Sequence, residues 1–331
     1  MEIAKALILA GRTAHDRPWP SVKSGPKQLV PVANRPILFH NLESLRRGGV
    51  LEATIAIERD SSAAIATAVG DGSDWGLSVR YVRWHPGSGL GGALDAAREF
   101  IADEPVLVEP ADALHREHIH PHIAAFASED LDAMALRVPG APRGAHGEPV
   151  AGGYLLSRRA ISMLLADPRA RTDPLTDVER RGGQVRVQPI DGCLPCHGGQ
   201  DRLLEGNRRM LEELCEPVDR EAFPTCEFQG PVLVDPTARL EHTLIRGPAI
   251  VGPGTTLSHA YVGPYTSIGA DVRIEGSEIE HSIVLDHAEI LHVGMRLDTS
   301  VIGRGARVHR RFGSGLGMRL SVGDGADVTL S

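Results

Sequence analysis

The sequence predicts two domains: a doubly wound, Rossmann-like α/β domain over residues 1–228 and a left-handed parallel β-helix over residues 229–331. Three observations predict this fold. The chain has 331 residues, more than one hydrophobic core usually supports. Short apolar runs alternate with amphipathic segments in its first part, and a repeat of five or six residues replaces them after residue 229.

The first expected strand is residues 6–10, an apolar run closed by Gly11 that suits a buried parallel strand. Residues 36–47 carry apolar side chains at helical spacing and end at two glycines, which predicts a helix. Because strands and helices alternate onward, we expect a parallel sheet covered on both faces. The further strands are expected at 54–57, 77–82, 106–108, 134–138 and 150–156, and the further helices near 90–101 and 115–126.

The last third of the chain repeats one aliphatic residue every five or six positions, and several of these residues are followed by glycine. Each coil of a β-helix buries one aliphatic residue per face and turns at small residues, so the period predicts this fold. An antiparallel sandwich is the alternative, although its strands need longer repeats. The repeating residues are Ile245, Val251, Leu257, Val262, Ile268, Ile274, Ile279, Val284 and Ile290.

Composition excludes several classes of function. A net charge of -8 offers no basic surface for nucleic acid or an anionic membrane. The apolar run at the N-terminus is shorter than a membrane span and has no basic leader, so a cytoplasmic protein without a targeting segment is expected. Four unevenly placed cysteines predict thiols or metal ligands, since they do not form a disulfide framework.

Residues 5–36 read KALILAGRTAHDRPWPSVKSGPKQLVPVANRP: a strand, a glycine, a long loop and a Pro-Lys pair. With this segment and the repeat, the chain resembles the long-type glucose-1-phosphate thymidylyltransferases of the sugar-1-phosphate nucleotidyltransferase family. The resemblance covers about residues 3–330 and is strongest over 25–45 and 245–330. It implies an enzyme that uses Mg²⁺ to join a nucleoside triphosphate, dTTP in this family, to a sugar 1-phosphate, releasing pyrophosphate.

The resemblance assigns roles to individual residues. Lys27 matches the lysine that steadies the phosphates, and Asp112 occupies the place of an aspartate that holds Mg²⁺. A helix N-cap is the alternative role for Asp112. The positions implied for the nucleotide are Ala10, Gly11, Arg12, Arg17, Gln28, Trp84 and Gly89, and those implied for the sugar are Gly152, Gly153 and Tyr154.

The sequence departs from the family's pattern at several of these places. The loop after Gly11 lacks the family's further glycines, so Arg12 or Arg17 either reaches the triphosphate or lies in solvent. Trp84 stands near the place of a base-reading glutamine, where it either stacks on a base or simply packs. No lysine follows Lys27, so the family's sugar-phosphate lysine is absent and Arg143 is the only cation near its place.

Cysteine and histidine clusters suggest a softer metal as an alternative to Mg²⁺. Cys196 stands where the family has a second metal aspartate, and with Cys193 and His197 it offers ligands that suit zinc. Four histidines at 115, 118, 120 and 122 also resemble a metal cluster, but Pro121 is expected to interrupt their helix, and packed or surface histidines are favoured.

Two functions therefore remain open at this point. The first is the nucleotidyltransferase, with a nucleotide and a sugar phosphate as small-molecule partners and neither nucleic acid nor a membrane. The second is a non-catalytic or repurposed homologue that binds a ligand or partner, because three parts of the family's site are altered. A homo-oligomer formed through the β-helix is a further expected partner.

Overall fold

The computed structural model describes residues 3–11, 26–58, 62–114, 119–137, 151–166, 173–190, 194–195, 199–214 and 218–310. These residues form two compact units. The first contains residues 3–11, 26–29 and the described residues from 36 to 195, and the second contains residues 30–35 and 199–310. The domain boundary between residues 228 and 229 stays a prediction.

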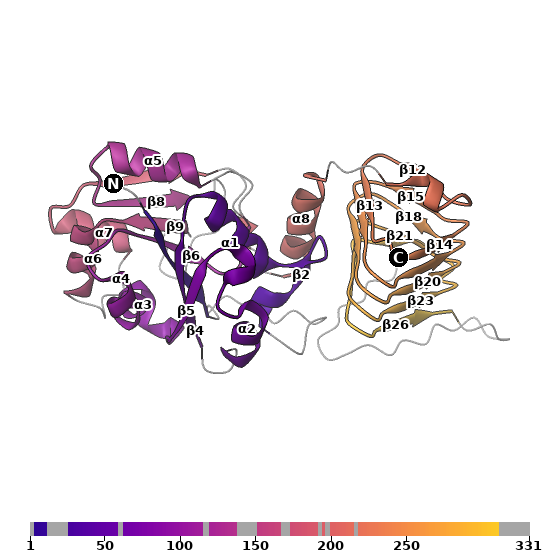
Figure 1. Ribbon diagram of the computed structural model, residues 1–331, viewed down its shortest axis with the longest axis horizontal. Coiled ribbons are helices and arrows are strands. Elements are labelled where there is room, and N and C mark those ends of the chain that lie inside the picture. The colour runs from indigo at the N-terminus through magenta and orange to yellow at the C-terminus, as the bar shows by residue number, and fades with distance from the viewer. Residues whose placement is uncertain are drawn as a thin grey trace. The chain divides into compact units, whose positions relative to one another are not determined.

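The first unit is built on a seven-stranded sheet in the order β10-β8-β9-β6-β1-β4-β5 (Figure 1). Neighbouring strands β6, β1, β4 and β5 are parallel, and β9 runs antiparallel to both of its neighbours, β6 and β8. The strands are β1 Lys5–Ala10, β4 Glu52–Ile57, β5 Ser78–Arg83, β6 Val106–Pro110, β8 Ala133–Arg137, β9 Ala151–Leu156 and β10 Val185–Pro189.

Helices cover both faces of this sheet because its strands are apolar on both sides. On β1, Ile8 belongs to an apolar cluster that includes residues of helices α1, α2 and α5, whereas Leu7, on the other face, belongs to a second cluster with residues of α3, α4, α6 and α7. The predicted doubly wound α/β fold is confirmed, but the expectation of a wholly parallel sheet was wrong, because β9 runs antiparallel to β6 and β8. The helices are α1 Ile37–Arg47, α2 Ser62–Val69, α3 Gly89–Ala96, α4 Arg98–Ile101, α5 His120–Ser128, α6 Arg158–Leu165 and α7 Pro174–Arg180, with short 3-10 turns η1 Lys27–Leu29, η2 Ser73–Trp75 and η3 Pro86–Ser88.

The second unit contains three parallel five-stranded sheets, the arrangement of a β-helix with three strands per coil (Figure 1). The predicted left-handed β-helix is therefore confirmed, and the antiparallel sandwich is wrong. Its strands are β12 Glu227–Gln229, β13 Val232–Val234, β14 Arg239–Glu241, β15 Leu244–Arg246, β16 Ala249–Val251, β17 Thr256–Ser258, β18 Tyr261–Val262, β19 Thr266–Ile268, β20 Arg273–Glu275, β21 Glu278–Glu280, β22 Ile283–Val284, β23 Glu289–Leu291, β24 Leu297–Asp298, β25 Val301–Ile302 and β26 Arg307–His309.

Three ladders of aliphatic and aromatic side chains fill the β-helix, one from each sheet. Every residue of the predicted repeat from Ile245 to Ile290 is buried, because each rests on its counterpart in the coil before and after. The ladders are Phe228, Ile245, Val262, Ile279 and Leu297; Val234, Val251, Ile268, Val284 and Ile302; and Leu240, Leu257, Ile274, Ile290 and Val308.

The second unit also includes helix α8 (Gln200–Leu211), the 3-10 turn η4 (Arg220–Ala222) and residues 30–35 of the hairpin formed by β2 (Pro31–Val32) and β3 (Arg35–Pro36). Two further short strands, β7 (Ala113–Leu114) and β11 (Leu194–Pro195), pair in the first unit. Helix α8 has 12 residues. In the described parts of the chain, no helix combines the length and apolar character that crossing a bilayer requires.

Ion pairs along α8 make its stability depend on pH. The hydrogen bond from Arg208 lowers the pKa of Glu205 to about 2 from its ordinary value of 4.5, with a further contribution from Arg209 and against the effect of burial. A lowered pKa stabilises the fold above pH 4.5, and this contribution is lost as the pH falls toward 2.

We expect Glu205→Gln to lower the free energy of unfolding at pH 7 by about 1 kcal/mol, because the carboxylate is partly exposed and its pairs are screened. Urea unfolding measured between pH 7 and 3 checks this. The difference from the wild type should shrink below pH 4.5, whereas Glu179→Gln on the exposed face of α7 should have little effect at any pH. A loss that stays constant with pH would contradict the ion-pair explanation.

Candidate active site

Several of the predicted site residues lie at one edge of the seven-stranded sheet. Strands β6, β1, β4 and β5 are parallel neighbours, so their carboxyl ends share this edge. Gly11 directly follows β1, Asp112 follows β6, and Trp84 follows β5. The backbone N–H of Ala111 donates to the Leu9 carbonyl at 3.0 Å, and this bond holds the start of the Asp112 turn against β1. Ligands of open α/β sheets bind at this edge.

Lys27 and Asp112 form an ion pair there, with Nζ 2.8 Å from Oδ2. Only 15% of the lysine side chain and 6% of the aspartate side chain are exposed. Lys27 begins the short turn η1, whose Leu29 N–H donates to the Pro26 carbonyl at 2.9 Å. The adjacent Gln28 is buried. Two residues that are far apart in the sequence thus place an ammonium and a carboxylate together at the rim of the sheet.

The chain after Asp112 does not begin a helix. Ala113 and Leu114 form β7, which pairs antiparallel with β11, so that Pro195 lies opposite Ala113. The N-cap alternative for Asp112 is therefore wrong. Its carboxylate faces Lys27 instead, and α5 begins only at His120.

The aromatic residue after β5 packs against the glycine after β1. A β-carbon on Gly11 would lie 2.8 Å from Cζ3 of Trp84 and would also collide with Pro86, so only glycine fits. The Trp84 indole Nε1 donates to the carbonyl of Gly89 at 3.2 Å. The structure thus brings together three of the residues predicted to contact the nucleotide, Gly11, Trp84 and Gly89, beside the buried Ala10.

The predicted sugar-binding residues Gly152, Gly153 and Tyr154 lie on β9, where Tyr154 pairs with Val108 of β6. A β-carbon on Gly153 would lie 2.9 Å from the Val108 carbonyl and 3.3 Å from Cγ of Glu109. Glu109 is buried in β6, three residues before Asp112. Sequence reasoning missed it, although a carboxylate inside the apolar run VLVEP was a signal.

Some predictions lie outside the described residues. These are the roles of Arg12, Arg17 and Arg143, the zinc alternative at Cys193, Cys196 and His197, and two of the clustered histidines, His115 and His118. Nothing we observe supports zinc. Helix α5 begins at His120, so Pro121 lies in its first turn and does not interrupt it, and His122 is buried. The expectation of an interrupted helix was wrong for this reason.

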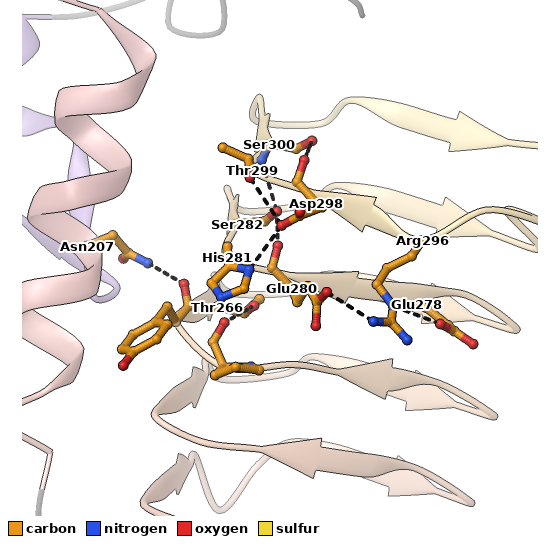
Figure 2. Close-up of polar contacts among 12 residues, drawn as sticks. Asn207, Thr266, Glu278, Glu280, His281, Ser282, Arg296, Asp298, Thr299 and Ser300 are labelled. Carbon is orange, nitrogen blue, oxygen red and sulfur yellow. Dashed lines mark hydrogen bonds and ion pairs between the residues drawn. The ribbon is translucent and has the colours of Figure 1, made fainter. Parts of the chain in front are cut away.

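In the described part of the chain, one group of side chains brings three metal-ligand atoms within 4.8 Å of one another: Glu280, His281 and Asp298 of the β-helix. Figure 2 shows that these residues already contact each other and a neighbouring cation. Arg296 Nη1 lies 3.0 Å from Glu280 Oε1, and His281 Nδ1 lies 3.0 Å from Asp298 Oδ1. These pairs explain the group as a surface ion network.

Comparison with known proteins points to one family. Residues 5–147 match the family model of the nucleotidyl transferases. The chain is 32% identical to a glucose-1-phosphate thymidylyltransferase of Streptomyces griseus, over 92% of this chain and 93% of that protein. It is 28% identical to a low-salt glycan biosynthesis nucleotidyltransferase of Haloferax volcanii, over 98% of this chain and all of that protein.

A solved structure has a fold similar to part of this chain. The crystal structure of a putative glucose-1-phosphate thymidylyltransferase from Bacillus anthracis, in complex with a sucrose, matches with a TM-score of 0.55. The match covers 65% of this chain and 97% of that one. At 19% sequence identity it shows a shared fold only.

Proposed function

The chain belongs to the sugar-1-phosphate nucleotidyltransferase family, and from this premise we propose that it transfers a nucleotidyl group from a nucleoside triphosphate to a sugar 1-phosphate. In this reaction a phosphate oxygen of the sugar 1-phosphate attacks the α-phosphorus, and the bond from that phosphorus to the bridging oxygen breaks, which releases pyrophosphate. The observation that carries the proposal is the Lys27–Asp112 ion pair at the carboxyl edge of the sheet. dTTP and glucose 1-phosphate are the proposed substrates, since relatives are named for them.

The residues at the edge have distinct proposed roles. The Lys27 ammonium offsets the negative charge that builds on the phosphates during attack, and its contact with Asp112 fixes its position beforehand. Gly11, at the end of β1, lets Trp84 pack against the chain where the phosphates would bind. The Trp84 ring stacks on the base, and Gly152, Gly153 and Tyr154 form a wall of the sugar site.

The buried oxygen ligands at this edge fit Mg²⁺. Asp112 would hold the ion, and Glu109, in the preceding strand β6, is the carboxylate nearest to it in sequence. Bound with the nucleotide, Mg²⁺ neutralises charge on the phosphate oxygens. Lys27 would retain its place beside Asp112 as the second positive charge of the site.

Pyrophosphate release tests the proposal. The purified chain should release pyrophosphate from dTTP, and form the nucleoside diphosphate sugar, only when glucose 1-phosphate and Mg²⁺ are both present. A panel of other nucleoside triphosphates and sugar phosphates establishes specificity. If no pair yields product, the alternative of a non-catalytic homologue replaces the enzyme.

Metal binding should depend on the nucleotide. With Asp112 as its principal protein ligand, Mg²⁺ takes its other ligands from water and phosphate oxygens, so Mg²⁺ alone should leave the melting temperature unchanged. Mg²⁺ together with dTTP should raise it by several degrees, because a ligand of the native state stabilises that state. Asp112→Asn should abolish most of the added effect of Mg²⁺ while leaving the response to dTTP alone. A shift by Mg²⁺ without nucleotide, or none with any nucleotide, contradicts this prediction.

A further inference from the structure

Helix α1 carries a polar residue in the middle of its apolar face. Leu38, Leu42 and Leu45 are fully buried on this face, and Asn41 lies among them at helical spacing with only 1% of its surface exposed. An apolar residue at this position would extend the face, whereas a buried amide gives up its hydrogen bonds to water. A buried amide is therefore expected where its own hydrogen bonds are needed.

The Asn41 amide bonds to the end of strand β6. Its Nδ2 donates to the Pro110 carbonyl at 3.2 Å. The ladder between β6 and β9 covers Val106 to Val108, so this carbonyl lies beyond it and receives a donor from the helix layer instead. No group of the described residues donates to Oδ1 of Asn41. The bond from Nδ2 is thus the contact that explains an amide at this position.

The peptide group between Pro110 and Ala111 is held from two sides. Its carbonyl accepts from Asn41, and its N–H donates to the Leu9 carbonyl of β1 at 3.0 Å. Ala111 is fully buried and belongs to the same apolar cluster as the leucines of α1. The next residue is Asp112, the buried carboxylate of the candidate site. A displacement of this peptide would therefore displace the carboxylate.

We propose that Asn41 is a positioning residue for Asp112: by holding the Pro110 carbonyl against α1, it fixes where the Asp112 carboxylate lies beside Lys27. All four residues belong to the first unit. The side chain acts through the peptide that precedes Asp112 and has no contact with the reacting atoms. Its effects on turnover and on metal binding rest on the proposed function, whereas its effect on the turn does not.

Steady-state kinetics of Asn41→Leu and Thr54→Val test the proposal. Thr54 of β4 is a matched control, because it is also fully buried and its Oγ1 also has no hydrogen-bond partner among the described residues. Asn41→Leu should lower kcat roughly 10-fold or more, since a small misplacement near the reacting groups is costly. Thr54→Val should keep the wild-type kcat. Equal kcat values in these two variants would overturn the proposal.

A second variant separates the lost donor from a change in packing. Leucine fills the space of the amide, whereas Asn41→Ala leaves that space empty, and both remove the donor to Pro110. The two variants should differ in melting temperature, because they change the packing of α1 in opposite directions. They should nevertheless lose a similar factor in kcat. A wild-type kcat in either variant contradicts a role for the donor.

Metal binding adds a readout that a purely structural role would not change. dTTP alone should raise the melting temperature of Asn41→Leu as much as that of the wild type. The further rise on addition of Mg²⁺ should fall to roughly half or less in this variant, because the ion loses a correctly placed carboxylate. In Thr54→Val the further rise should be unchanged. An undiminished effect of Mg²⁺ in Asn41→Leu refutes the positioning of Asp112.

Hydrogen–deuterium exchange tests the turn without any need for activity. In Asn41→Leu, the backbone N–H groups of Ala111 and Asp112 should exchange faster, whereas in Thr54→Val they should keep their wild-type rates. Wild-type rates at both positions in Asn41→Leu refute the proposal. A wild type without turnover on any substrate pair refutes the proposed function instead, and the exchange result then decides the positioning proposal by itself.

Discussion

Lys27→Ala should lower kcat/KM by about 10²- to 10³-fold, which is the effect of removing one preorganised group that stabilises developing charge. The ammonium lies 2.8 Å from the Asp112 carboxylate, and this buried contact holds it in place. Pyrophosphate release with dTTP and glucose 1-phosphate measures the loss. Lys27→Arg keeps the charge but changes its shape, so it should retain more activity than the alanine variant. Unaltered turnover in Lys27→Ala would remove this residue from the mechanism.

The same substitution should also destabilise the fold, by up to about 3 kcal/mol, because it removes a partner from a buried carboxylate. The double variant Lys27→Gln with Asp112→Asn removes both charges and should recover most of this stability while remaining inactive. Thermal unfolding of the wild type, Lys27→Ala and the double variant measures the change in stability. The pyrophosphate assay measures their activity. If the double variant regains turnover, the loss in Lys27→Ala reflected instability rather than catalysis.

The fold was predictable because its main signals are periodic and local. Each buried aliphatic residue from Ile245 to Ile290 belongs to a ladder of the β-helix. The spacing of these residues in the sequence therefore predicts which side chains stack in the structure. The hairpin at residues 31–36 was not predictable, since its turn depends on a hydrogen bond from Ala33 to Asn207. Neither residue is unusual within its own segment, and the contact joins distant parts of the chain.

The residues of the candidate site could be predicted from separate motifs, but the contacts between them could not. Lys27 and Asp112 were each singled out by the motif around them, but the sequence does not show that they form an ion pair. The packing of Trp84 on Gly11 depends on β5 and β1 ending at one edge.

The position of a core residue within a β-helix ladder should determine how much free energy of unfolding is lost when it is replaced by alanine. Ile274 is fully buried and its strand pairs on both sides, with Leu257 and Ile290 as its ladder neighbours. Leu240 occupies the same ladder at the edge of its sheet, where β14 pairs only with β17 among the described strands, and it is half-buried. Ile274→Ala should therefore lose about 2 to 5 kcal/mol of unfolding free energy, from lost burial and the cavity left behind.

Leu240→Ala removes a side chain of the same size, yet it should lose less than half as much, because the end of the ladder is partly open to solvent and has a neighbouring coil on one side only. Urea unfolding of both variants and of the wild type, followed by circular dichroism, measures the two losses. A third variant, Arg273→Ala, changes an exposed residue beside Ile274 and should cost little, which controls for substitution in this coil. Equal losses at Ile274 and Leu240 would show that the coils do not depend on neighbours on both sides, and would contradict the stacking that defines the fold.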